Sequence, residues 1–455
     1  MTSSALSGTP DIEQLYLFKP LSGSNKVISA ADNKLWEGTT TLSNITGAVA
    51  VTANKWKFVT FNGACYGLQA SHALIKYTGS GNFANVTAGA GSVPDGNELL
   101  SAFGRLWGTS SDGQTVKYCA LLDATTWSGV GAGSINFTSV WGNGADEIVA
   151  LAAFNSFLVV FGKHNIIVLA DGSGSSLGLD PANIQVVDMV SGIGCYARDS
   201  VQNVNGDDLV FLSYSGVQSL NRIIQERSNP LRDITLNNRD FVKTYAISGQ
   251  ANTIRSCYSP GYGMYLLALP GASRIFCFDT KVKLPDGSWR MTEWEGLIPK
   301  SLISLESGNT IYGGYAGKVF QYSGYQDNGS SYTLVFESGW MNFGDEINNR
   351  LKFLKRVGGL FIIGGTQTLV FKWAFDFSDS FKSFQKTITY NSGGGEYGIA
   401  EYGEDEFGGS SLTFETDVPG SAQGQFIKVG VQTVINGYAV TLQNLQLFTK
   451  IGRLA

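Results

Sequence analysis

Asp207–Ile224 reads DDLVFLSYSGVQSLNRII, and this stretch contains the unit from which most of the chain is built. Leu209–Leu212 is a short apolar strand, Ser213–Gly216 is a turn, and Val217–Leu220 is a returning strand. Two β-rich runs joined by a Ser/Gly turn predict an antiparallel hairpin. A lone hairpin is marginally stable in water, so we expect it to pack its apolar faces against further copies.

The same pattern recurs from Trp56 onward with no helical segments between most of the copies. The third-strand positions Tyr77, Tyr118 and Leu169 are 41 and 51 residues apart, and Phe278 and Tyr322 are 44 apart. Four-stranded propeller blades recur at roughly 40–50 residues. We therefore predict an all-β chain containing a β-propeller of about six blades, although no WD or kelch motif marks the repeats. The expected repeats are Lys57–Tyr77, Leu99–Trp127, Ile148–Ala170, Ala197–Leu220, Ile254–Trp294 and Ser301–Tyr322, the last completed by Tyr332–Phe336.

Three further segments flank or interrupt the predicted propeller at residues 51–338. Residues 1–50 are polar and irregular, which fits either an extended arm lying on another part of an assembly or a frayed tail. Residues 229–246 mix apolar and charged residues at near-helical intervals, which predicts an inserted helix or ordered loop. This insertion is either a contact surface or a cover for a blade edge. Residues 339–455 contain roughly seven strands separated by turns, which predicts a C-terminal β-sandwich.

The composition fits short strands and glycine turns. Glycine occurs 57 times and proline 10 times, aromatic residues make up 12% of the chain, and charged residues only 15%. The formal net charge of −5 leaves no basic footprint for tight binding to nucleic-acid phosphates. We therefore expect no sequence-specific nucleic-acid binding.

The five cysteines are scattered and form no CxxC pair, which indicates free thiols in a protein made in a reducing cytoplasm. The N-terminal residues lack the basic start and apolar core of a signal peptide. No uncharged apolar run approaches the ~20 residues of a membrane-spanning helix. We therefore expect no direct membrane insertion.

Residues for catalysis are sparse, and we expect neither an enzyme nor a bound cofactor or metal. The two histidines, His72 and His164, both fall in predicted turns, and no GxSxG, P-loop or HExxH motif occurs. Paired carboxylates could make a propeller a glycosidase, with Asp207, Asp208 and Asp279 as candidates. Asp207 and Asp208, and the Asp-Gly pairs at Asp112 and Asp286, are more simply explained as turn residues.

Several features in order resemble the tail nozzle proteins of short-tailed bacteriophages, also called tail tubular protein B. The matching pieces are Phe61-Asn62-Gly63 before the Lys76-Tyr77 strand, the Trp107 strand ending in Asp123–Trp127, Gly192–Ser200 leading into Asp207–Leu220, the polar insertion before Tyr262–Leu269 and Ile275–Trp294, and a terminal β domain ending in Gly-Arg. These cues are spread along much of the chain. The chain is compact beside the larger members of that family.

This resemblance implies a virion structural protein, made in the host cytoplasm and built into the tail. It implies a ring, expected to be a homohexamer, at the distal end of a short tail. The ring would dock on the portal-adaptor complex, hold tail fibres or spikes, and enclose the channel for DNA ejection. A net-negative lumen would let genome DNA slide without holding it.

A ring of identical copies needs heterologous contacts, in which one surface meets a different one. Our hypothesis is that a basic strand of one copy opposes the acidic, glycine-rich loop Gly393–Gly409 of its neighbour. Alternatively, these charges only keep two faces of the sandwich soluble, and the acidic loop is either a solvated loop or a Ca²⁺ site. The interface candidates are Arg350, Lys352, Lys355 and Arg356 in the strand, Glu401, Glu404, Asp405 and Glu406 in the loop, and Arg232 and Arg239 in the insertion.

Two other classes of function remain open from the sequence. One is a receptor-binding or glycan-binding propeller of a phage tail, with or without glycan cleavage. The other is a cellular scaffold propeller with no viral connection.

Overall fold

The computed structural model describes residues 4–142, 144, 146–172, 179–226, 233–247, 249–305, 310–342, 350–390 and 412–454. The chain divides into two units, Met1–Tyr322 and Ser323–Ala455. Five cysteines, all buried and free, lie in the first unit, as the sequence predicted.

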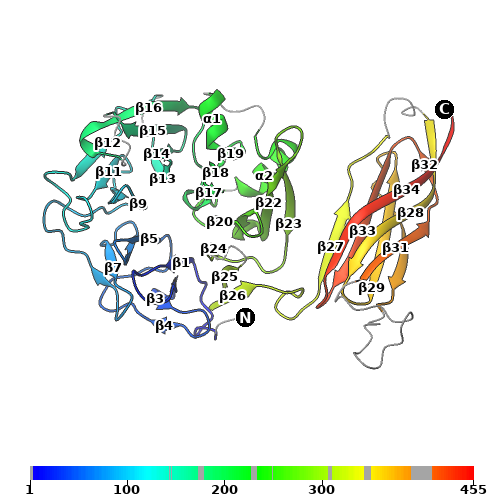
Figure 1. The fold of residues 1–455 in the computed structure, drawn as a ribbon, viewed down its shortest axis with the longest axis horizontal. Helices are drawn as coiled ribbons and strands as arrows, with labels where there is room; N and C mark the ends of the chain where they lie inside the picture. Colours follow the sequence, from blue (N-terminus) through cyan, green and yellow to red (C-terminus); the bar gives the residue numbers. More distant parts are fainter. Residues whose placement is uncertain are drawn as a thin grey trace, which may run out of the picture. The chain divides into compact units, whose positions relative to one another are not determined.

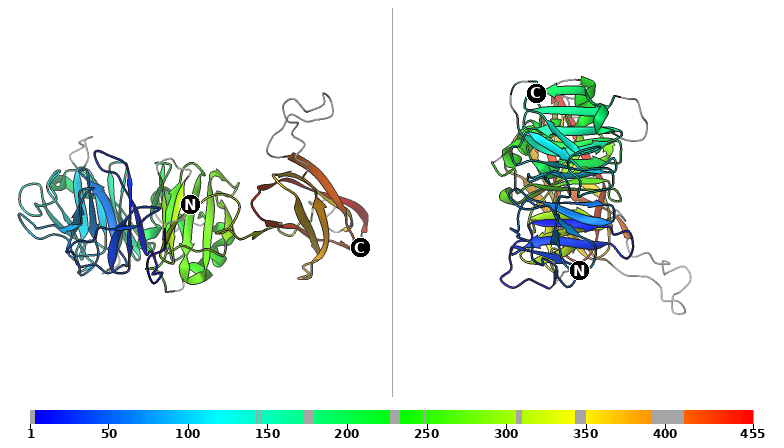
Figure 2. Two further views of the ribbon diagram at one scale, coloured as in Figure 1. Left: turned by 90° about the horizontal axis from the view of Figure 1, so that it is seen from below. Right: turned by 90° about the vertical axis from the view of Figure 1, so that its left-hand side faces the viewer.

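The described part of the first unit contains seven antiparallel sheets, set radially as the blades of a β-propeller (Figure 1). Figure 2 shows the same blades from the side, with their strands running roughly along the propeller axis. The first three blades are β1 (Gln14–Phe18), β2 (Lys26–Ala31), β3 (Lys34–Glu37) and β4 (Ser43–Asn44); β5 (Lys57–Phe61), β6 (Ala64–Leu68), β7 (Ile75–Tyr77) and β8 (Ala84–Asn85); and β9 (Leu99–Ala102), β10 (Arg105–Thr109), β11 (Thr115–Tyr118) and β12 (Gly133–Asn136). The other four are β13 (Ile148–Phe154), β14 (Phe157–Gly162), β15 (Asn165–Asp171) and β16 (Ile184–Ser191); β17 (Gln202–Val204), β18 (Asp208–Ser213) and β19 (Gly216–Ser219); β20 (Arg255–Ser259), β21 (Met264–Leu269), β22 (Arg274–Lys283) and β23 (Trp289–Trp294); and β24 (Ser301–Ser304), β25 (Ile311–Tyr315) and β26 (Lys318–Tyr322).

Apolar side chains hold neighbouring blades together. Among the described residues, each pair of adjacent blades shares one buried apolar cluster, and the pair formed by the last and first blades is included. In that closing cluster, Ile12 and Leu15 pack with Val319. The Leu6 amide also donates to the Gly317 carbonyl at 2.9 Å, and the Ser301 hydroxyl to the Ile12 carbonyl at 2.7 Å. The ring is therefore closed by segments from the two ends of the unit.

The N-terminal region is where the prediction was wrong. The segment expected to be an arm, residues 1–50, contains the four strands β1 to β4 of the first blade. The blade count is therefore seven instead of about six. These strands are short, and their buried faces carry alanine and serine as well as larger apolar residues: Ser29, Ala30 and Ala31 are all fully buried in β2. We predicted strands from runs of strongly hydrophobic residues. Alanine and serine contribute little to such runs, so these strands were not recognised as a blade.

The two α-helices of the described residues lie beside the fifth blade, where no fourth strand is present among these residues. Helix α1 (Leu220–Glu226) follows β19 directly, and α2 (Arg239–Ala246) follows the 3₁₀ turn η3 (Leu236–Asn238). Val242 and Ala246 of α2 are buried in the cluster shared by the fifth and sixth blades. The predicted insertion at 229–246 thus does contain a short helix, and this helix covers a blade edge.

The second unit is a β-sandwich of two antiparallel sheets. One sheet has the order β27 (Tyr332–Glu337), β33 (Ile427–Ile435), β29 (Gln367–Phe375) and β30 (Lys382–Ile388). The other joins β31 (Leu412–Pro419), β28 (Arg350–Ile363), β32 (Gln423–Gly424) and β34 (Val440–Leu454). The core between them includes Val357, Phe361, Phe371 and Val429.

One strand belongs to a different unit from the one we predicted. Tyr332–Phe336 was expected to complete the last blade, but β27 pairs with β33 across its whole length, from Tyr332 opposite Ile435 to Glu337 opposite Gly430. The boundary therefore lies near residue 322, about sixteen residues before the predicted boundary at 338. A six-residue β-rich run fits any open sheet edge, so its local sequence does not choose between two sheets.

Candidate functional site

Five charged side chains from four blades lie close together where the first strands of these blades begin. Arg198 and Asp199 belong to the 3₁₀ turn η2 (Arg198–Ser200), which leads into β17. Lys57 begins β5, Glu98 directly precedes β9, and Arg255 begins β20. We call these five residues, Lys57, Glu98, Arg198, Asp199 and Arg255, the central ionic cluster.

Arg198 links three blades through its guanidinium. Its Nη1 donates to the Lys55 carbonyl at 2.8 Å and to the Asn97 carbonyl at 2.6 Å, and its Nη2 donates to the Trp56 carbonyl at 3.3 Å. Nη2 also lies 2.8 Å from Asp199 Oδ2. Because the accepting carbonyls belong to the segments that enter the second and third blades, Arg198 ties those blades to the fifth.

Asp199 completes the connection to the sixth and first blades. Its Oδ2 lies 3.3 Å from Arg255 Nη1, and its Oδ1 lies 3.9 Å from Lys57 Nζ. Arg255 in turn donates from Nε to the Glu13 carbonyl, just before β1, at 3.3 Å. Burial alone would raise the pKa of Asp199, but Arg198, Arg255 and Lys57 outweigh it and hold this pKa well below its ordinary value.

Glu98 is a buried carboxylate whose charge is only partly compensated by its neighbours. Its side chain is 1% exposed, with Lys57 Nζ 3.2 Å from Oε1 and Arg198 Nε 3.7 Å from Oε2. Neither oxygen accepts a well-aligned hydrogen bond from the described residues. Burial therefore raises the pKa of Glu98 to about 7, against the opposing effect of Lys57 and Arg198.

The basic strand predicted as an interface is only partly available for contacts between copies. Lys352 is fully buried, and its ammonium donates to the Gln425 carbonyl at 2.8 Å. The prediction that Lys352 lies at an interface is therefore wrong. Arg356 is 53% exposed but pairs within the chain with Asp417 at 2.6 Å and stacks on Phe448. Lys355 and Arg350 are exposed. Alternation along β28 explains the error, because position 352 faces the core together with Leu354.

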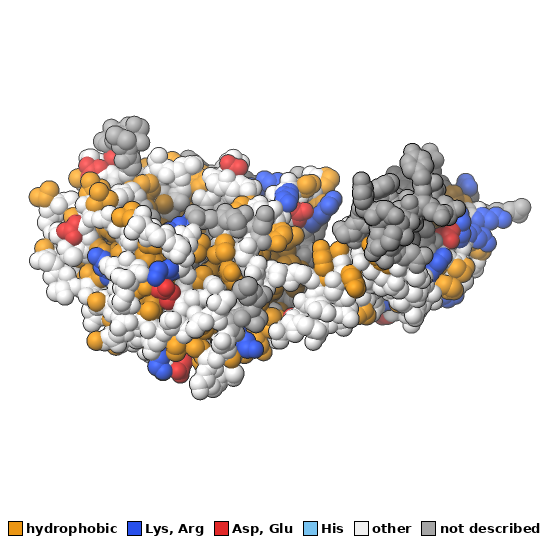
Figure 3. All heavy atoms as spheres, turned by 60° about the horizontal axis from the view of Figure 1, so that its bottom comes forward, with side chains coloured by type: hydrophobic (Ala, Val, Ile, Leu, Met, Phe, Trp, Pro, Cys, Tyr) orange, Lys and Arg blue, Asp and Glu red, His pale blue; other side chains and the backbone are white. Residues whose placement is uncertain are grey.

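Figure 3 shows Lys and Arg side chains gathered on part of the second unit. The proposed acidic counterparts Glu401, Glu404, Asp405 and Glu406 lie outside the described residues, as does Arg232. The pairing between the strand and the loop therefore stays a prediction.

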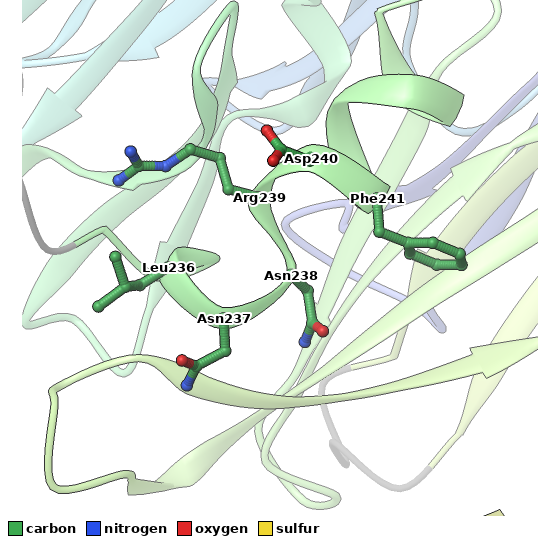
Figure 4. A pocket seen from close by; sticks show the side chains of 6 residues that line it. All are labelled: Leu236, Asn237, Asn238, Arg239, Asp240 and Phe241. Carbon is green, nitrogen blue, oxygen red and sulfur yellow. The ribbon is translucent and has the colours of Figure 1, made fainter. Parts of the chain in front are cut away.

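The remaining insertion candidate, Arg239, has a partner within the chain. Its Nε donates to the buried Asp233 carboxylate at 2.8 Å. Burial raises the pKa of Asp233, although Arg239 opposes this shift. A shallow hollow of about 300 Å³ lies beside this pair and is lined by the six consecutive residues Leu236 to Phe241 (Figure 4). Their side chains spread away from one another in Figure 4, so they form no converging site.

Asp208 and Asp279, considered for glycoside hydrolysis, and the two Asp-Gly aspartates all hold turns and strand ends. Asp208 accepts hydrogen bonds from the Ser219 hydroxyl and, at 3.1 Å, from the Asn221 amide at the start of α1. Asp279 accepts from the Lys281 amide at 2.9 Å, and Asp112 from the Thr115 amide at 2.9 Å. Asp286 accepts from the Ser288 amide at the same distance. All four carboxylates thus stabilise local backbone geometry.

The histidines contact aromatic rings. His72 lies against Trp56, and His164 stacks on Tyr214 at 5.5 Å between ring centroids. Across the described ranges, no group of three or more His, Cys, Asp or Glu side chains is placed to hold a metal ion. No helix in these ranges is long and apolar enough to cross a membrane.

Comparison with known proteins found matches among solved structures. No protein-family model and no curated protein matches the sequence. Solved structures titled "Structure of U3-55K" and "Crystal structure of RRP9 WD40 repeats" align with 12% and 13% identity and TM-scores of 0.43 and 0.45. Each alignment covers 69% of this chain, and 91% and 90% of the respective structures. "Crystal structure of WD40 beta propeller domain of Doa1" aligns with 11% identity and a TM-score of 0.42, over 71% of this chain and 95% of that structure. The strands and sheets described above themselves show that the chain is all-β and contains a β-propeller.

Proposed function

We propose that this chain is a structural protein of a phage virion, one copy of the nozzle ring at the distal end of a short tail. The resemblance of its ordered features to tail nozzle proteins motivates this assignment. The structural observation that supports it best is the central ionic cluster, since its side chains tie the blades together where an enzymatic propeller would present a substrate site. A propeller with a structural role instead makes its contacts through its outer surfaces and loops.

In this proposal the DNA channel is the opening between copies of the chain. Arg198 and Asp199 make polar contacts with residues at the entrances of the second, third and sixth blades, so charged side chains cross the interior of a single propeller. A DNA duplex would therefore pass through the middle of the ring of subunits, which is expected to be hexameric. The portal adaptor and the fibres or spikes would bind on opposite ends of that ring.

Electron microscopy of the purified full-length chain tests this function. We expect hollow rings with a constant number of subunits, and six is the number proposed. Particles that stay single at micromolar concentration, both alone and mixed with the portal-adaptor complex of the same phage, would contradict the nozzle assignment.

Charge reversal at one exposed residue tests the interface separately. Lys355→Glu should weaken ring assembly at physiological salt if this strand faces the acidic loop of a neighbour, because like charges then oppose each other. Lys318→Glu makes the same charge change at an exposed position in β26 and is the matched control. Rings that form equally well with both variants would remove the charge pairing from the proposal while leaving the nozzle assignment standing.

A further inference from the structure

A second hollow, of about 520 Å³, lies on the outer face of the β27–β33–β29–β30 sheet in the second unit. All ten residues that line it are uncharged, and glutamine, asparagine and threonine are the main polar types among them. The hollow is thus chemically unlike the charged strand β28 in the same unit. Its volume falls within the range of small-molecule sites, roughly 300–1,000 Å³.

The strand register sets amide groups at regular intervals across this face. Val335 lies opposite Gln432, Gln432 opposite Val370, and Val370 opposite Gln385. Adjacent strands are about 4.8 Å apart, so the two glutamines stand roughly 10 Å from each other with Val370 between them. Each amide side chain offers both hydrogen-bond donors and an acceptor. The row therefore alternates polar groups that can bind hydroxyls with apolar groups that can contact a ring face.

Tyr438 adds an aromatic side chain to the lining of the hollow, just beyond the end of β33. It is 54% exposed and lies in the turn between β33 and β34. A Cβ added to Gly365 would meet the Tyr438 ring at 2.6 Å, so the ring lies directly against that glycine. The Gly437 amide donates to the Tyr325 carbonyl at 2.9 Å, and the Gly364 amide to the Ala439 carbonyl at 3.0 Å. The backbone on both sides of Tyr438 is therefore held before any ligand arrives.

Other polar groups at the hollow are also positioned by contacts within the unit. Asn436 Oδ1 accepts from Gln326 Nε2 at 2.8 Å, which leaves the Asn436 amide nitrogen directed elsewhere. The Thr368 and Thr387 hydroxyls are 3.0 Å apart. Lys372, the next residue after Val370 on the same face of β29, lies opposite Ser383, outside the hollow. The hollow therefore occupies the uncharged end of this sheet face.

We propose that this hollow binds a neutral oligosaccharide, with Tyr438 stacking on a sugar ring and Gln432, Gln385 and Asn436 binding its hydroxyls. A neutral sugar presents hydroxyl donors and acceptors together with an apolar ring face, and this lining matches both. Fixed charge would favour an ionic ligand, and none lines the hollow. Amphipathic rings such as tyrosine suit a ligand that is apolar on one side and wet on the other. The site lies within one chain, so its occupancy does not depend on the proposed ring.

A glycan array probed with the full-length chain tests the proposal. The array should carry neutral polymers of glucose, galactose, mannose and N-acetylglucosamine beside sialylated and sulfated oligosaccharides. We expect binding to at least one neutral series, followed by titration calorimetry with the best soluble oligosaccharide. No binding to any neutral series, or a preference for the charged ones, would overturn the proposal.

Substitutions at the hollow test whether the glycan binds there. Tyr438→Ala should lower affinity by about tenfold or more, as loss of a central aromatic contact does. Gln432→Ala should lower it by about three- to tenfold through loss of one neutral hydrogen bond. Tyr262→Ala removes a comparably exposed tyrosine (43%) from the propeller and should leave affinity unchanged.

Melting temperatures of these three variants, and of a fourth variant Gln385→Ala, check folding. If Tyr438→Ala unfolds the second unit, Gln432→Ala and Gln385→Ala carry the test, because both side chains lie on the outer face of the sheet. Unchanged glycan affinity in the folded variants would overturn the site. So would chain self-association that these variants abolish without any glycan binding, because a second copy would then be the occupant.

Discussion

The two units solve the problem of open strand edges in different ways. In the propeller, the first strand of each blade faces a ring interior filled by its neighbours, and polar contacts across that interior are made by Arg198 and Asp199. In the sandwich, β27 ends its sheet with all six residues exposed, among them Leu334, Val335 and Phe336. Radial repetition thus covers inner edges, whereas a two-sheet sandwich leaves edges that need a partner or a charge.

Charge is also used differently in the two units. The propeller buries ion pairs at the centre, where removing one partner leaves another charge without compensation. The sandwich keeps its Arg356–Asp417 pair at the surface, where water screens it. The following three predictions test this contrast, beginning with the largest expected effect.

Arg198→Met should destabilise the propeller by roughly 3–5 kcal/mol, since two buried carboxylates would each lose one paired cation. Glu98 would then keep only Lys57, and Asp199 would keep Arg255 and Lys57. Arg356→Met is the matched change in the sandwich and should cost about 0–1 kcal/mol. Hydrogen exchange resolved by strand measures each unit separately. Equal protection losses in β5 and β28 would show that the central ionic cluster is no more important than a surface pair.

The pH dependence of propeller stability should reveal Glu98. Its folded pKa of about 7 lies above its ordinary value of 4.5, so the folded state holds a proton between these values that the unfolded state has released. Its contribution is present below pH 4.5 and is lost as the pH rises through about 7. Asp199 acts in the opposite sense, since its lowered pKa contributes stability above about pH 3.8 that is lost at more acidic pH.

The free energy of unfolding of the wild type should fall by on the order of 1–3 kcal/mol between about pH 5 and 8 because of Glu98. Glu98→Gln should therefore make this free energy less dependent on pH over the same range. Thermal unfolding of the wild type and the variant across this range measures the difference. Glu147→Gln, at a 56% exposed position in the same unit, is the control and should leave the wild-type slope unchanged. A slope that survives in Glu98→Gln would assign the dependence to another group.

Leu334→Lys should have the smallest effect on folding, within about 0.5 kcal/mol, because the side chain is 41% exposed. Its effect should appear in association, since a lysine on an open edge strand opposes pairing with another strand. Leu21→Lys adds the same charge at an 84% exposed position outside any strand. Sedimentation velocity at high concentration should show less self-association only for Leu334→Lys. Identical profiles for both variants would show that the edge of β27 takes no part in self-association.

The sequence by itself determined the all-β class, the repeated hairpins and the C-terminal sandwich. Alternating apolar residues and glycine turns, as in Leu209–Leu220, are local patterns. They can be recognised without knowing which other strands the segment contacts in the folded chain. The sequence also predicted that the cysteines are free and buried, and that aspartates such as Asp112 and Asp286 lie in turns.

Only the tertiary structure decided the blade count, the unit boundary and the candidate sites. The first blade needed its ring neighbours to bury its small residues, and β27 needed β33 to give it a register. Lys57, Glu98, Arg198 and Arg255 are up to about 200 residues apart in sequence, and each looks like an ordinary charge at a strand entrance. The one local hint was that charges precede several inner strands in a chain otherwise poor in charge. Their proximity arises from the closed ring, because long-range contacts depend on where the chain returns and not on the residues beside them.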